Sequence, residues 1–198
     1  MTRSRMLSVV IPLLALGTGW AASPGAADDK VLKLRAVAVD PGGVTPEGGR
    51  RASTGRLDVG IERWTTDAEH ARLAAVLAEK GPDALLHELQ KMPRSGYIRT
   101  PSTVGWNIHY ARQMPLPDGG RRIVFATDRP MNFWELWNRP RSAEYQFLLA
   151  EIRLGPDGKG KGTLVPAAKI DYYEPTKTIE VENYSSQPVR LTDVQIEK

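Results

Sequence analysis

Hydrophobic and polar residues alternate along several stretches of the chain. In "RLDVGIERW" (56–64), polar or small residues separate Leu57, Val59 and Ile61. A period of two places these three side chains on the same face of a half-buried β-strand. Similar alternation, or a short β-branched run, predicts further strands at 30–40, 96–100, 104–114, 121–128, 144–154, 162–173, 177–184 and 189–197.

Short segments rich in glycine and proline separate the later strands. They read "LPDGG", "GPDGKGK", "EPT" and "SSQP". The Asp-Gly pair tolerates the positive φ that tight hairpin turns require. Short turns between successive strands predict an antiparallel meander.

The period changes between residues 65 and 93. Thr66 and Glu69 have the spacing of a capping box, and Gly81 is a typical residue after the end of a helix. A second apolar stripe with helical spacing begins after Pro82 and ends at Pro93. The sequence therefore predicts a helical hairpin inserted among the strands.

The N-terminus has the three parts of a secretory signal peptide. Basic "MTRSR" precedes the apolar run "MLSVVIPLLALGTGWAA", and small and polar "SPGAADD" follows it. We expect cleavage near residues 21–27, export to the periplasm or the medium, and no stable membrane anchor afterwards. The absence of cysteine from the chain fits a bacterial envelope better than a disulfide-rich extracellular space.

These segments predict the organisation of the whole chain. A signal peptide (1–27) is followed by an N-terminal strand (28–40), a loop or linker rich in glycine and proline (41–55), and a single domain (56–198). The predicted fold class is α+β: a curled antiparallel β-sheet or partial barrel with the helical hairpin covering one face or end.

The charge pattern argues against a nucleic-acid partner. The formal net charge is +4, and it falls to about +2 when Arg3 and Arg5 leave with the signal peptide. Acidic and basic residues are interleaved without a block of like charges, which is typical of a solvated surface.

The chain lacks the usual signatures of catalytic and metal sites. It has no cysteine, no Gly-x-Ser-x-Gly motif, no His-x-x-x-His pair and no acidic calcium loop. We therefore expect no cofactor and no metal. Of the three histidines, His70 and His87 are predicted to face solvent from the helical segments, and His109 lies on a predicted strand.

The densest aromatic segment is "RPMNFWELWNRPRSAEY" (129–145). Its aromatic residues are spaced by three and four positions, so a short helical turn would place them on the same face. They would then either plug one end of the sheet or form a ligand platform beside an arginine. The candidate ligand-binding residues are Phe133, Trp134, Trp137, Arg129, Arg139 and His109.

Three functions are compatible with these patterns. The first is an exported, non-enzymatic module that binds a small ligand or an envelope partner. The second is a hydrolase acting on an envelope or extracellular saccharide, with Asp128 and Glu135 as its pair of carboxylates. The third is a structural or assembly protein, which would show an apolar patch or a free sheet edge.

Four stretches resemble a group of secreted bacterial proteins of unknown function. They read "IERWTTDAEHARL", "GYIRTP", "ATDRPMNFWE" and "VENYSSQPVRLT", and the resemblance covers roughly residues 56–198. It implies an exported bacterial protein and carries no activity, cofactor or site residue.

Overall fold

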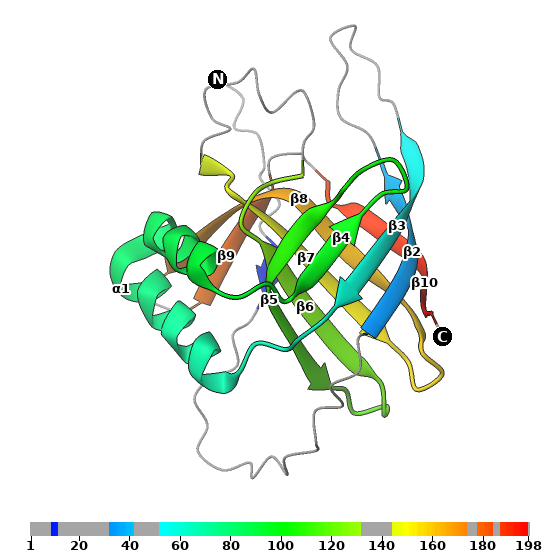
Figure 1. Ribbon diagram of the computed structural model, residues 1–198, viewed down its shortest axis with the longest axis horizontal. Coiled ribbons are helices and arrows are strands. Elements are labelled where there is room, and N and C mark those ends of the chain that lie inside the picture. The colour runs from blue at the N-terminus through cyan, green and yellow to red at the C-terminus, as the bar shows by residue number, and fades with distance from the viewer. Residues whose placement is uncertain are drawn as a thin grey trace, which may run out of the picture.

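The computed structural model describes residues 9–11, 32–41, 52–131, 144–173, 178–183 and 187–197. Eight of the described strands form a closed antiparallel β-barrel (Figure 1). Around the ring the order is β2, β3, β4, β5, β6, β7, β8 and β10. Their bounds are β2 Leu32–Asp40, β3 Ser53–Ile61, β4 Gly96–Arg99, β5 Trp106–Pro115, β6 Arg121–Thr127, β7 Phe147–Leu154, β8 Lys159–Tyr173 and β10 Val189–Ile196. The prediction of an antiparallel sheet is confirmed, but the sheet is a closed barrel rather than a partial one.

Closure depends on β10, which hydrogen-bonds to β8 on one side and to β2 on the other. Gln195 lies opposite Arg35 of β2, and Leu191 lies opposite Gly162 of β8. The strand that precedes β10 in the chain, β9 (Thr178–Asn183), is not part of the ring. It pairs with the second half of β8, and β1 (Val9–Ile11) pairs with β9.

Apolar side chains fill the inside of the barrel. Alternate residues of the strands point inward, and the largest of them, such as Phe125, Ile98, Ile108 and Leu34, are almost completely buried. A barrel of eight strands is just wide enough for side chains to fill its interior. The inward positions are therefore occupied by the main hydrophobic core.

One helix, α1 (Asp67–Lys91), follows β3, so the predicted helical hairpin is wrong. The capping box at its start is confirmed, because the Thr66 hydroxyl accepts from the backbone of Glu69 and the Glu69 carboxylate accepts from the backbone of Thr66. Gly81 interrupts the helical geometry with a φ of 82°, and Pro82 follows it. A single interrupting residue is shorter than ordinary helix–helix connections, so it bends the helix at this point instead of separating two antiparallel helices.

Helix α1 lies against the outer surface of the barrel (Figure 1). Its buried face consists of Leu73, Leu77, Leu85 and Leu89. These leucines belong to a second hydrophobic cluster, which includes residues of β6, β7, β8 and β9. Within the described part of the chain, no helix is long and apolar enough to cross a membrane. The described fold is mostly β, and its two largest apolar clusters lie inside the barrel and beneath α1.

Candidate functional site

Several of the sequence-predicted site residues lie outside the described residues. They are the ligand candidates Phe133, Trp134, Trp137 and Arg139, and the carboxylate candidate Glu135.

The described candidates lie near the end of the barrel where β6 finishes. Asp128 and His109 are brought together, with 3.9 Å between Oδ1 and Nε2. The other ring nitrogen of His109 is 3.0 Å from the carbonyl oxygen of Met92, the residue that caps the end of α1. Arg129 is exposed and donates to the carbonyl of Gly105 at 3.4 Å. In this geometry His109 holds the end of α1 against β5.

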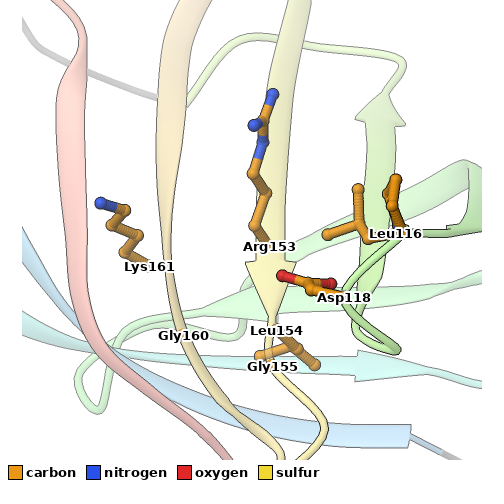
Figure 2. Close-up of a pocket in the computed structure, with 8 residues that line it drawn as sticks. Leu116, Asp118, Arg153, Leu154, Gly155, Gly160 and Lys161 are labelled. Atoms are coloured by element: carbon orange, nitrogen blue, oxygen red, sulfur yellow. The ribbon is translucent and has the colours of Figure 1, made fainter.

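A groove of about 600 Å³ lies on the outside of the barrel, between the β5–β6 and β7–β8 hairpins. Figure 2 shows Arg153 and Lys161 on neighbouring strands, with the carboxylate of Asp118 beside the end of β7. The groove is open to solvent. Its lining residues are Leu116, Pro117, Asp118, Arg153, Leu154, Gly155, Gly160 and Lys161.

Three cations form a row across the strands beside this groove. Arg122 of β6 lies directly opposite Arg153 of β7, which in turn lies directly opposite Lys161 of β8. Like charges in directly opposite positions of a sheet repel each other. One carboxylate compensates part of this charge, because Glu151 accepts from Arg122 at 2.7 Å and from Arg153 at 2.8 Å. Among the described residues, Lys161 has no carboxylate partner.

The ionisation of Glu151 reflects this arrangement. Burial alone would raise the pKa of its carboxyl group, but the hydrogen bonds from Arg153 and Arg122 outweigh burial and hold the pKa below its ordinary value. Glu151 is therefore a stable negative charge between the two arginines. Lys161, the third cation of the row, does not share this carboxylate.

The walls of the groove differ in character. Leu116 and Pro117 provide an apolar wall on the β5–β6 side. The Asp118 carboxylate on the same side accepts from the backbone amide of Gly120 at 2.9 Å, so part of its hydrogen-bonding capacity is used within the turn. The ionisable side chains among the described lining residues are those of Asp118, Arg153 and Lys161. The groove thus combines an apolar wall on one side with the cationic Arg153 and Lys161 on the other.

A polar contact joins α1 to the barrel wall. The hydroxyl of Tyr110 lies 3.1 Å from Nδ1 of His70, so His70 does not simply face solvent as predicted, whereas His87 is exposed. Burial lowers the pKa of His70, and the nearby Arg112 lowers it further, against the opposite effect of Asp67. Burial likewise raises the pKa of Tyr110. Both groups are therefore neutral at neutral pH, and their hydrogen bond fastens the first half of the helix.

No cluster of three or more His, Cys, Asp or Glu side chains that could hold a metal ion is found in the described ranges.

No protein-family model, curated protein or solved structure matches this chain. The geometry of the described residues therefore carries the functional argument.

Sequence reasoning missed the groove and its row of cations. Arg122 and Arg153 lie within predicted strands, and Lys161 immediately precedes one. Alternation alone places Arg122 and Arg153 on the outer face, opposite the buried Ile123 and Ile152. That signal was available in the sequence. What brings the three cations together is the register between strands, which no single strand encodes.

Proposed function

We propose that this protein is an exported, non-enzymatic binding module that takes a small anionic ligand at the groove between the β5–β6 and β7–β8 hairpins. The observation that carries this proposal is the row formed by Arg122, Arg153 and Lys161, of which Arg153 and Lys161 line the groove.

The packed interior supports a ligand site on the outside of the barrel. Larger barrels, and some barrels of eight strands, hold a ligand within the ring. Here inward-facing side chains such as Phe125, Ile123 and Ile152 are fully buried against one another in the main core. A ligand would have to displace that core to enter, whereas the groove is open.

Electrostatics support an anionic ligand. Repulsion between directly opposite cations lowers the stability of the free protein, and Glu151 relieves it for the two arginines only. An anion placed between Arg153 and Lys161 would relieve the remaining repulsion. The side chain of Arg153 is 62% exposed, so its guanidinium group keeps donors available to a ligand while it contacts Glu151.

The size and walls of the groove support a small ligand with an apolar part. Its volume of about 600 Å³ lies within the range of small-molecule sites, roughly 300–1,000 Å³. Leu116 and Pro117 offer apolar surface on one side, while the cations lie on the other. A carboxylate with a short alkyl chain satisfies both.

The test is a titration of the folded protein with three probes followed by NMR. Octanoate combines an anion with an alkyl chain, acetate has only the anion, and octanol has only the chain. We expect octanoate to bind more tightly than either of the other probes and to shift the backbone amides of Gly155 and Gly160. Lys161→Gln should weaken octanoate binding by up to about fivefold, because an exposed ion pair contributes up to about 1 kcal/mol.

A matched control removes one charge elsewhere. Lys80→Gln changes an exposed lysine of α1 and should leave octanoate binding unchanged. Octanoate binding that is equally strong after the double change Arg153→Gln and Lys161→Gln would overturn the proposal, and so would an absence of octanoate binding to the unmodified protein.

A further inference from the structure

Three arginines on neighbouring strands converge on one aspartate, on the outer face of β2, β3 and β4. Asp58 of β3 lies opposite Arg35 of β2 and opposite Arg99 of β4. Arg56 donates to Asp58 at 3.2 Å, while Nε of Arg35 and Nε of Arg99 lie 3.9 Å and 3.8 Å from its carboxylate oxygens. This arginine cluster consists of Arg35, Arg56 and Arg99 around Asp58.

The cluster carries more positive than negative charge. The Asp58 side chain is only 12% exposed, whereas the three arginine side chains are 44–50% exposed. Arg35 has a second partner in Glu197, but Arg56 and Arg99 have only the shared Asp58 among the described carboxylates. Each guanidinium has five N–H donors, and one carboxylate can satisfy few of them. Donors of three guanidinium groups therefore face solvent around a buried anchor.

An aromatic ring restricts one of these arginines further. The guanidinium of Arg99 lies 5.2 Å from the ring centroid of Tyr97, within the range of a cation–π contact. The ring of Tyr97 lies over Gly60, since a Cβ atom at that glycine would come within 2.4 Å of Cε1 of the ring. Arg99 is thus held between Tyr97 and Asp58 before any ligand arrives, which reduces the entropy that binding would cost.

We propose that the arginine cluster binds a phosphate group, as a second anion site separate from the groove. Its cations come from three adjacent strands, which lie about 4.8 Å apart in a sheet. The three guanidinium groups converge on Asp58, so each can meet a different oxygen of a tetrahedral phosphate, whereas a carboxylate has only two oxygens to offer. The planar guanidinium fork also matches the geometry of phosphate oxygens.

The phosphate can come from a soluble metabolite or from a lipid headgroup. Both present the same oxyanion to Arg35, Arg56 and Arg99. In this site Asp58 is a positioning residue: it gathers the arginines from below, and the phosphate binds on their exposed side. The inference does not depend on the groove, because none of these residues lines it.

The experiment follows the arginine Nε–H signals of the full chain by NMR during addition of inorganic phosphate at constant ionic strength. We expect saturable shifts of the Arg56 and Arg99 signals with phosphate, and no saturable shift with sodium chloride or acetate. The double change Arg56→Gln and Arg99→Gln should weaken phosphate binding by about tenfold or more, as expected when two charge-assisted hydrogen-bonding groups are lost. The matched control is Arg72→Gln with Lys80→Gln, which removes the same charge from α1 and should leave binding intact.

Arg99→Lys keeps the charge but removes the planar fork, so it should weaken phosphate binding while the protein remains folded. This variant keeps the test informative if the double variant is unstable. The proposal is wrong if chloride produces the same shifts as phosphate, or if phosphate binds equally well to the unmodified protein and to Arg99→Lys. Binding to phosphatidylglycerol vesicles that requires Arg56 and Arg99 would support a lipid source of the phosphate. Saturable binding of free phosphate without vesicle binding would support a soluble source.

The proposed phosphate site and the proposed groove site can be tested separately. Arg153→Gln with Lys161→Gln should weaken the response to octanoate and leave the response to phosphate at Arg99 unchanged.

Discussion

The packed barrel interior makes a strong prediction for Phe125→Ala. Phe125 lies on β6, points inward and is 0% exposed. Its truncation removes a fully buried aromatic ring and leaves a cavity that the surrounding strands cannot fill, because hydrogen bonds on both sides fix the position of β6. Phe→Ala changes in such cores cost about 3–5 kcal/mol of unfolding free energy. For a domain of this size, that corresponds to a melting temperature lower by roughly 6–20 °C.

The assay is equilibrium unfolding in urea at 25 °C, followed by tryptophan fluorescence and by circular dichroism. If the two transitions coincide, a two-state model can be used to calculate the free energy of unfolding. The matched control is Val124→Ala at the preceding residue, which faces outward and is half-buried. We expect that change to cost at most about 1 kcal/mol, as is usual away from a packed core.

A small effect would contradict a tightly packed barrel interior. If Phe125→Ala cost less than about 1 kcal/mol, the ring would not be packed against its neighbours as tightly as its burial implies. The barrel would then have room inside, and a ligand site within the barrel would become as plausible as one on its outer surface. A loss near 4 kcal/mol with little loss in Val124→Ala would confirm that the interior is solid.

Two further predictions concern α1. Gly81→Ala should lower the unfolding free energy by about 1–2 kcal/mol, because φ is 82° there and an L-residue is strained in that region even though no atom lies within 4 Å of the added methyl group. If Gly81→Ala instead raised the unfolding free energy by about 1 kcal/mol, measured by thermal or urea unfolding, the helix would be continuous at this position. Because the folded pKa of His70 is lowered from its ordinary value of 6.5, the unfolded chain binds a proton more readily. Stability should be complete above that value, fall as the pH drops from it toward the lowered folded pKa, and level off below. Urea unfolding across this pH range should show a smaller loss in His70→Gln, with the exposed His87→Gln as control, and equal profiles in all three proteins would contradict the assignment.

Local patterns predicted the strands well because the alternation of apolar and polar residues within a strand reflects which of its side chains are buried. Leu57, Val59 and Ile61 alternate in sequence and are all buried in the structure. The turn at "LPDGG" likewise joins β5 to β6, with Gly119 at a φ of 80°. These features depend on neighbours in sequence, so the sequence reveals them directly.

The closure of the barrel could not be predicted in the same way. It requires β10 to pair with β2 and β8 rather than with β9, the strand that precedes it in the chain. An alternating strand such as 189–197 fits a meander equally well, since its buried face has the same pattern in either arrangement. The same limit applies to α1. Gly81 and Pro82 are typical of a helix boundary, and only tertiary packing distinguishes a bent helix from two antiparallel helices.

The arginine cluster illustrates the same limit at the level of a site. Arg35, Asp58 and Arg99 are far apart in the sequence and carry no motif. They become neighbours because the hydrogen-bond registers of two strand pairs align them. A single charged residue on an alternating strand indicates only an outward face, so charge clusters on a sheet become visible when the registers are known.

The pairing of β10 with β2 has a consequence for how the chain reaches its native state. In sequence order β10 is the last strand of the ring, and it lies beside the first, β2. Until residues 189–196 leave the ribosome, a nascent chain can form at most an open sheet, with the edges of β2 and β8 unpaired. Contacts that span almost the whole chain also slow folding, because the ends must meet before the pairing stabilises them. Loss of β10 would therefore leave an aggregation-prone sheet with two free edges instead of a slightly smaller barrel.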